Sequence, residues 1–244
     1  MLMKFFGGRW LVNTVLAVSL LANIACFAYL ARSGGLRRIF MKLELVELPP
    51  TRLDFQKDDE TRYRKLPNTA AEIDFAGDSL INSGPWAELF GEIHNRGIGG
   101  ETTQGILGRL DEITEAKPAQ IFLLIGTNDL AAGAPESQVL RNYRTILERV
   151  RIESPKTAVT VIGLLPVNPA LPGRPTQTNA QVTSVNRQLQ TLIGEFPGVR
   201  YLDLTSFLVD SSGNLNADLS PDGIHLNIDG YLAIRKPIQE ALSR

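Results

Sequence analysis

Residues 121–129 read IFLLIGTND. A short, continuous apolar run that ends at once in a Gly-Thr-Asn-Asp turn is typical of a strand buried on both faces of a parallel sheet. Shorter or similar apolar runs occur at 73–76, around Ile93, at 159–165 and at 199–204. The sequence therefore predicts five strands, of which residues 121–125 are the strongest candidate.

Amphipathic segments separate these runs. Apolar residues recur every three or four positions over 106–113, 139–150 and 182–196, which predicts helices with one apolar face. A closing helix is expected over 228–242, capped by Asn227 and bent or interrupted by Pro237. Strand–helix alternation of this kind predicts an α/β fold: a three-layer, doubly wound, flavodoxin-like parallel five-stranded sheet. Functional groups should then gather at the carboxyl ends of the strands.

The composition removes several classes of function. The 244 residues carry 25 basic and 26 acidic side chains, so there is no strong basic field for nucleic acid. The single cysteine, Cys26, excludes a disulfide framework, a thiolate zinc site and an iron–sulfur cluster. We expect no metal and no organic cofactor. Any mechanism that needs an imidazole has two candidates, His94 and His225.

The amino-terminal segment has a different character. Residues 10–31 contain no charge, glycine or proline, and Trp10 and Tyr29 lie near the two ends. As a helix the run would be about 33 Å long, close to the ~30 Å hydrocarbon core of a bilayer. These features predict a basic tail over 1–9 and a transmembrane anchor over 10–31. A cleaved signal peptide is the alternative, because Lys4 and Arg9 resemble a basic n-region.

The remaining chain divides into a juxtamembrane connector, 32–70, and a globular domain, 71–244. Basic residues flank the apolar run on both sides, and their excess on the carboxyl side opposes export of the domain. A short tail before a large domain is, however, the usual layout of an exported signal anchor. We therefore expect a single-pass membrane protein with an extracytoplasmic domain.

Four short motifs follow predicted strands or precede the last helix. They are GDSL at 77–80, NRGIGGET at 95–102, GTND at 126–129 and DGIH at 222–225. Each alone is explained by an ordinary turn or helix cap. Together they supply a serine nucleophile, a backbone donor, a carboxamide donor and an Asp–His pair at one edge of the sheet. That set is what acyl transfer through a tetrahedral intermediate requires.

The spacing of Asp222 and His225 lets the carboxylate reach Nδ1 of the imidazole across a tight turn. His94 has no acid close in sequence, so we interpret it as structural. Asp78 is expected to tie down its turn rather than to take part in the chemistry.

The four motifs, in this order, resemble those of the SGNH (GDSL-type) esterase and lipase superfamily, nearest to its platelet-activating-factor acetylhydrolase-like branch. The resemblance covers roughly residues 70–244. It implies a serine esterase, and with the anchor predicted from residues 10–31 this would be a membrane-anchored enzyme acting on a lipid, lysophospholipid or acetylated glycan ester. It further implies that Ser79 is the nucleophile and His225 the general base, which Asp222 orients. The oxyanion hole would come from Ser79, Gly100 and Asn128. Leu226 departs from the family, whose members often have proline there.

Two alternatives remain at this point: an acyltransferase with the same triad, and a catalytically silent, membrane-tethered binding module. A separate expectation concerns residues 166–178, which carry four prolines and follow the fourth predicted strand. This segment is predicted to shape the acyl or alcohol pocket, although a stiff surface loop would have the same composition.

Overall fold

The computed structural model describes residues 73–243 and, before them, residues 13, 14, 17–20, 23, 24, 29, 61, 63 and 65. The chain separates into two units, residues 1–51 and 52–244. The described residues of the first unit are helical and exposed. No helix in the described part of the chain is both long and apolar enough to span a bilayer. Most of the predicted anchor, 10–31, and of the connector, 32–70, lies outside the described residues.

The second unit is built on a parallel five-stranded sheet with the strand order β2-β1-β3-β4-β5. This is the flavodoxin-like order, and the prediction of a doubly wound α/β fold is confirmed. The strands are β1 (Ile73–Gly77), β2 (His94–Gly97), β3 (Gln120–Leu124), β4 (Ala158–Ile162) and β5 (Val199–Leu202). Every residue of β3, the central strand, is buried.

One strand lies later in the sequence than predicted. The sequence predicts a strand centred on Ile93, followed by a turn that contains Asn95 and Gly97. In the structure β2 begins at His94 and includes both, paired in register with β1. The Asn95 carboxamide donates to the backbone carbonyls of Ile81 and Asn82, which offsets the low strand propensity of asparagine.

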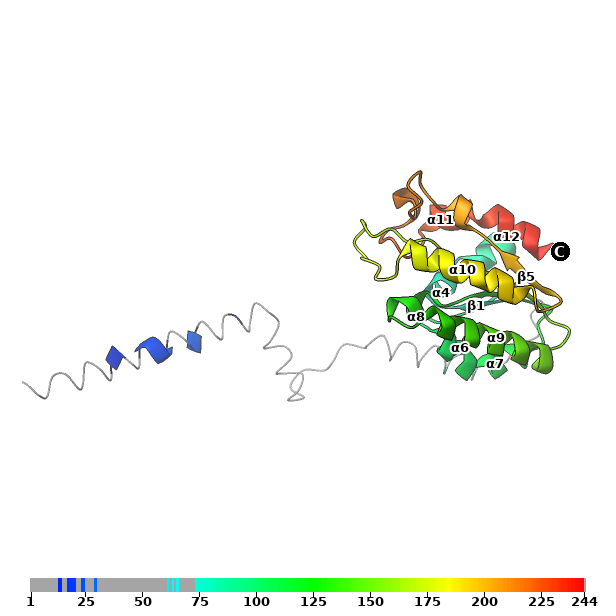
Figure 1. The fold of residues 1–244 in the computed structure, drawn as a ribbon, viewed down its shortest axis with the longest axis horizontal. Coiled ribbons are helices and arrows are strands. Elements are labelled where there is room, and N and C mark those ends of the chain that lie inside the picture. Colours follow the sequence, from blue (N-terminus) through cyan, green and yellow to red (C-terminus); the bar gives the residue numbers. More distant parts are fainter. Residues whose placement is uncertain are drawn as a thin grey trace, which may run out of the picture. The chain divides into compact units, whose positions relative to one another are not determined.

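Helices cover both faces of the sheet (Figure 1). On one face α6, α7 and α10 each contact the long helix α9. On the other face the Tyr231 hydroxyl of α11 donates to the Leu80 carbonyl of α4, and Tyr231 meets the Trp86 ring of α5 edge to face. The bounds are α4 (Ser79–Asn82), α5 (Trp86–Phe90), α6 (Thr103–Gly108), α7 (Leu110–Thr114), α8 (Thr127–Ala131), α9 (Glu136–Glu153), α10 (Asn179–Ile193), α11 (Ile228–Ala233) and α12 (Arg235–Leu242), with 3-10 turns η1 (Thr205–Phe207) and η2 (Ala217–Leu219).

Two predicted helices are interrupted. The segment 106–113 divides into α6 and α7 at Arg109, whose side chain is fully buried. The closing helix is capped by the Asn227 side chain, as predicted, and breaks at Ile234. Pro237 then falls in the first turn of α12, where a missing N–H costs no intrahelical hydrogen bond.

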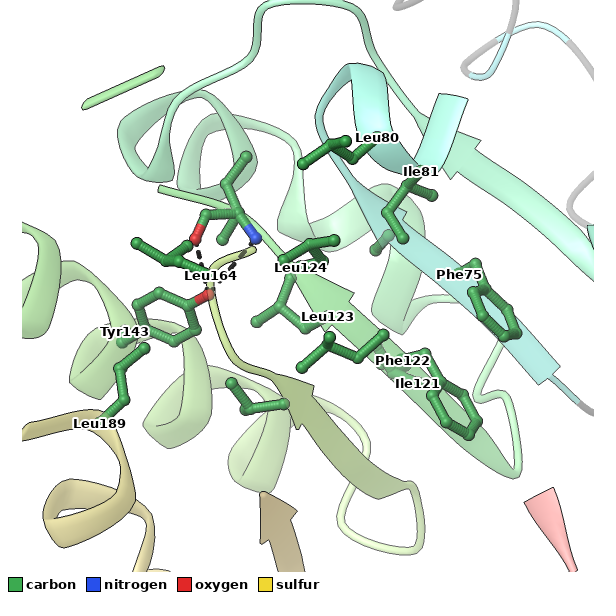
Figure 2. Packing of buried hydrophobic residues seen from close by; sticks show 14 of the residues in the cluster. Phe75, Leu80, Ile81, Ile121, Phe122, Leu123, Leu124, Tyr143, Leu164 and Leu189 are labelled. Carbon is green, nitrogen blue, oxygen red and sulfur yellow. Dashed lines mark hydrogen bonds between the residues drawn. The ribbon is translucent and has the colours of Figure 1, made fainter. Parts of the chain in front are cut away.

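The core is continuous across the sheet. Phe75 and Phe122 stack with their ring centroids 4.7 Å apart, and Phe75 also stacks with Trp86 at 4.6 Å. Across the opposite face, the buried Tyr143 hydroxyl donates to the Ile125 carbonyl at 2.7 Å (Figure 2). This bond fixes the end of β3, immediately before the Gly126–Asp129 turn.

Candidate active site

Ser79 is the first residue of α4, directly after β1. Its position depends on Gly77, where an added Cβ would lie 2.0 Å from the Leu124 carbonyl oxygen of β3. Asp78 is the N-cap, and its carboxylate accepts a hydrogen bond from the Leu80 N–H at 2.9 Å. The prediction that Asp78 ties down this turn is therefore confirmed. Ser79 itself is half-buried at the start of α4, beyond the carboxyl end of β1.

The DGIH turn brings a carboxylate and an imidazole to the same place. Asp222 Oδ1 accepts the backbone N–H groups of Ile224 (2.9 Å) and His225 (2.8 Å). Asp222 Oδ2 lies 2.7 Å from His225 Nδ1, and His225 Nε2 lies 2.9 Å from Ser79 Oγ. Because a carboxylate only accepts, this network places a hydrogen on Nδ1 and leaves Nε2 to accept from the serine hydroxyl.

Asp222 is ionised at neutral pH. Partial burial raises its pKa, but hydrogen bonds from the His225 ring and from the His225 and Ile224 N–H groups outweigh this effect, so that the pKa falls below its usual value. The carboxylate therefore presents a negative charge to His225 Nδ1 at 2.7 Å.

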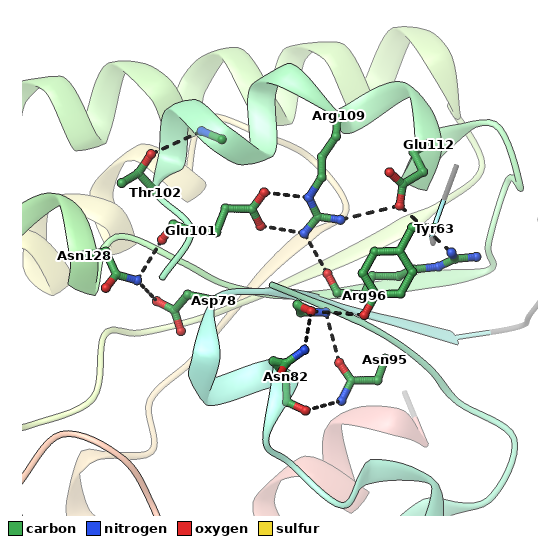
Figure 3. A network of polar contacts seen from close by, with 12 residues as sticks. Tyr63, Asp78, Asn82, Asn95, Arg96, Glu101, Thr102, Arg109, Glu112 and Asn128 are labelled. Carbon is green, nitrogen blue, oxygen red and sulfur yellow. Dashed lines mark hydrogen bonds and ion pairs between the residues drawn. The ribbon is translucent and has the colours of Figure 1, made fainter. Parts of the chain in front are cut away.

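Glu101 connects Gly100 to Asn128: it follows Gly100 in the chain, and its carbonyl contacts the Asn128 side chain. Gly100 has φ +80° in the turn that follows β2, a conformation that favours glycine. Asn128, in the first turn of α8, donates from Nδ2 to the Glu101 carbonyl at 2.8 Å. The same nitrogen lies 3.4 Å from Asp78 Oδ2. The Asn128 carboxamide thus contacts the neighbours of both Gly100 and Ser79 (Figure 3).

The proline-rich segment 166–178 packs against the DGIH turn. The Asn168 N–H donates to the Gly223 carbonyl at 2.9 Å, and the Gly173 N–H donates to the Asp222 carbonyl at 2.8 Å. At its far end the Thr176 hydroxyl donates to the Ala131 carbonyl of α8 at 2.8 Å. The segment therefore connects the Asp–His turn with the helix that carries Asn128; its predicted role in the pocket stays a prediction.

His94 lies at the start of β2, whereas the four motifs gather at the opposite, carboxyl edge. Its Nδ1 is 3.6 Å from Asp74, its register partner on β1. Burial and the nearby Arg96 lower the pKa of His94. In the described part of the chain, no three His, Cys, Asp or Glu side chains cluster closely enough to hold a metal ion.

Sequence reasoning missed two buried charged residues next to this site, Glu101 and Arg109. Glu101 lies in the glycine-rich motif and Arg109 lies within the predicted helix 106–113, and the sequence suggested no role for either side chain. The sequence signal for burial was the position of Arg109 among the apolar residues of the predicted helix 106–113.

The fold and the position of this site at the carboxyl edge of a doubly wound sheet are those of a class of α/β enzymes that hydrolyse ester bonds. The particular family is shown by sequence. The chain belongs to the GDSL-like Lipase/Acylhydrolase family, whose profile matches residues 75–233. The predicted resemblance is confirmed, and the protein is an ester-bond hydrolase.

Among curated relatives, the human platelet-activating factor acetylhydrolase IB subunit alpha2 is 32% identical over 179 residues, covering 70% of this chain and 76% of its own. The rat subunit alpha1 is 30% identical over 181 residues, covering 71% of this chain and 75% of its own.

Solved structures agree. A Streptococcus pneumonia protein, whose description refers to platelet activating factor, superposes with a TM-score of 0.73 and 32% identity over 78% of this chain and 94% of its own. The acetyl xylan esterase AlAXEase has a TM-score of 0.59 and 15% identity, covering 70% and 98% of the two chains. At that identity the second likeness shows the fold alone.

Proposed function

We propose that this protein is a serine esterase that hydrolyses carboxylic esters through an acyl-enzyme on Ser79. The observation that carries the proposal is the unbroken hydrogen-bonded succession from Ser79 Oγ through His225 to Asp222, with separations of 2.9 and 2.7 Å. A serine hydroxyl is a weak nucleophile unless a base takes its proton, and this arrangement supplies the base and the group that orients it.

In the acylation step Ser79 Oγ bonds to the ester carbonyl carbon while its proton passes to His225 Nε2. The carbonyl π electrons move to oxygen and form an oxyanion. Collapse of this intermediate breaks the bond to the leaving alcohol, which takes the proton from His225. Water then adds to the acyl carbonyl carbon as His225 takes one of its protons. Collapse of this second intermediate breaks the bond to Ser79 Oγ, which takes the proton from His225, and the carboxylic acid is released. Asp222 stays ionised and stabilises the imidazolium in both halves.

The oxyanion would be held by the N–H groups of Ser79 and Gly100 and by Asn128 Nδ2. Two arrangements support this role: the Ser79 amide is at the first turn of α4, and Asn128 contacts the neighbours of both other donors. Removal of one such donor typically costs on the order of 10²–10³ in rate.

The substrate class we propose is a lipid, lysophospholipid or acetylated glycan ester. The names of the relatives, acetylhydrolases of platelet-activating factor, support a short acyl group. We also propose that residues 10–31 anchor the chain as a single pass with the domain outside the cytoplasm. The uncharged run with aromatic residues near both ends supports the anchor.

The test uses the full chain in detergent and follows hydrolysis of p-nitrophenyl acetate, butyrate and octanoate. Ser79→Ala and His225→Ala should abolish turnover, whereas Ser83→Ala, an exposed serine at the end of the same helix, should leave it unchanged. Equal rates for wild type and Ser79→Ala would refute the nucleophile assignment. An ester product with an added acceptor alcohol would identify acyl transfer in place of hydrolysis.

The anchor needs a separate measurement. Carbonate extraction of membranes should leave the full chain in the pellet, and a chain lacking residues 1–31 should be released. Protease treatment of intact spheroplasts of an expressing bacterium should cut an extracytoplasmic domain. Protection until lysis would overturn the predicted side of the membrane without affecting the chemistry.

A further inference from the structure

A cluster of buried charges lies next to the oxyanion side of the site (Figure 3). We call it the Arg109 cluster; it consists of Arg96, Glu101, Arg109 and Glu112, all nearly inaccessible to solvent. Arg109 is 0% exposed. The four side chains carry two positive and two negative formal charges, so the cluster is neutral as a whole.

The strongest contact in the cluster joins Arg109 to Glu101. Arg109 Nε donates to Glu101 Oε1 at 2.6 Å, and Nη2 donates to Oε2 at 2.5 Å, a parallel two-bond pair. Nη2 also donates to the Arg96 carbonyl of β2 at 2.7 Å. One guanidinium therefore joins the helix break between α6 and α7 to the strand end and to the turn after it.

Arg109 is charged. Burial lowers the pKa of Arg109, but its hydrogen bonds and charge interactions with Glu101 and Glu112 outweigh burial and raise it. The packing around the pair is close: a Cβ at Gly105 would lie 2.7 Å from Glu101 Cγ. Glycine at this position in α6 leaves the space that the Glu101 side chain occupies.

Glu101 connects the cluster to the candidate oxyanion hole. Its side chain is held by Arg109, its carbonyl accepts Asn128 Nδ2 at 2.8 Å, and its peptide bond joins it to Gly100. Fixing the Glu101 side chain therefore fixes the backbone that carries one predicted donor and orients the other.

We propose that the Arg109–Glu101 ion pair is a positioning device for the oxyanion donors Gly100 and Asn128. This inference rests on the proposed function. Arg109 and Glu101 are positioning residues, because they act through the two donors rather than on the ester. A buried ion pair is a poor source of stability, since apolar residues of similar volume are often as stable. Its planar two-bond geometry instead gives orientation, which is what pre-organised donors require.

The experiment compares Arg109→Lys, Glu101→Gln and the double variant Glu101→Gln/Arg109→Met with wild type. Lysine keeps the charge but cannot make two parallel bonds, and the double variant removes both charges if a single change prevents folding. We would measure kcat and KM for p-nitrophenyl acetate. We would also measure the inhibition constant of a trifluoromethyl ketone, which adds to a serine hydroxyl to form a tetrahedral oxyanion.

We expect Arg109→Lys to lower kcat by about 10- to 100-fold and to raise the inhibition constant of the ketone by a similar factor. Both effects are smaller than that of losing a whole donor. KM should change by about twofold or less, because the ground-state carbonyl gains little from these donors. In an Asn128→Ala background the effect of Arg109→Lys should be smaller, since one of the donors that it positions is already absent.

Two controls separate positioning from stability. Arg144→Lys alters an exposed Arg–Glu pair, and Val150→Ala removes part of a buried side chain on α9 that does not belong to the cluster. If Arg109→Lys and the double variant change kcat and ketone affinity no more than these controls, the inference is overturned. If wild type lacks Ser79-dependent turnover, the proposed function itself fails. Ser79-dependent turnover with unaffected Arg109 variants would overturn the positioning role alone.

Discussion

Replacing Asp74 with asparagine is expected to stabilise the protein at neutral and alkaline pH. Asp74 lies on β1 and is fully buried, and neither carboxyl oxygen has a hydrogen-bond partner in the described part of the chain. Burial raises its pKa from 3.8 to about 7; the positive charge of Arg96 opposes this rise and the negative charge of Glu112 adds to it. Asparagine has the same shape without the charge.

The magnitude follows from proton linkage. Between pH 4 and 7 the folded protein holds a proton on Asp74 that the unfolded chain releases, so the free energy of unfolding falls as pH rises. A tenfold change in proton affinity corresponds to about 1.4 kcal/mol, so the full rise in pKa corresponds to about 4 kcal/mol. Above pH 7 the penalty is complete, and below pH 4 it is absent. For Asp74→Asn the free energy of unfolding should not show this decline between pH 4 and 7.

The assay is urea unfolding of wild type and Asp74→Asn at pH 4 and at pH 8. The difference between the two pH values cancels any effect of asparagine that does not depend on protonation. Asp210→Asn is the control, because hydrogen bonds from Ser212 lower the pKa of that exposed carboxyl, and its removal should give no gain at pH 8. Parallel stability curves for wild type and Asp74→Asn would refute the argument that burial raises the pKa of Asp74.

Three further predictions concern the site. Asp222→Asn should lower kcat by on the order of 10⁴ with little change in KM, because the amide would donate to Nδ1 and select the wrong imidazole tautomer; Asp210→Asn, in a similar turn without an imidazole, should keep full activity. Asn128→Ala should lower kcat about 10²–10³-fold and leave circular dichroism unchanged; a change in KM alone would contradict an oxyanion role. Gly77→Ala should abolish cooperative unfolding, since its Cβ would lie 2.0 Å from a β3 carbonyl oxygen, whereas Gly108→Ala, with open space around it, should unfold like wild type.

The strands and motif positions were predictable because their signals are local. An apolar run of five residues and a Gly-Thr-Asn-Asp turn are contained in residues 121–129, and the structure places β3 and α8 there. The start of β2 was not predictable in this way. Asn95 and Gly97 are ordinary turn residues, and they sit in a strand because Asn95 bonds to the backbone of α4 and Gly97 packs against it. Those contacts join residues that are distant in the sequence, so they produce no periodic pattern of apolar residues.

In the candidate site, too, local contacts were predictable from the sequence and contacts that depend on packing were not. Asp222 and His225 are three residues apart, so their contact could be inferred from spacing. The contact of Arg109 with Glu101 joins two residues on either side of a helix start, and nothing in their spacing distinguishes it from an exposed pair. Its significance comes from burial, which is a property of the packed α6–α9 layer and of the space left at Gly105.

The contacts of Asn128 Nδ2 with the Glu101 carbonyl and with Asp78 Oδ2 differ in length, and the difference has a consequence for the proposed mechanism. An amide nitrogen has two hydrogens. The one directed to the Glu101 carbonyl makes a 2.8 Å bond whose acceptor is held by Arg109, whereas the contact with Asp78 Oδ2 is 3.4 Å. An oxyanion that enters the site therefore competes with Asp78 and leaves the Glu101 bond in place. Burial raises the pKa of Asp78 to about 7. The competing carboxyl is thus held partly neutral, and a neutral carboxyl is a weaker acceptor than the oxyanion. In the proposed mechanism the oxyanion therefore replaces Asp78 as the acceptor of the second hydrogen, while the first stays bonded to the Glu101 carbonyl.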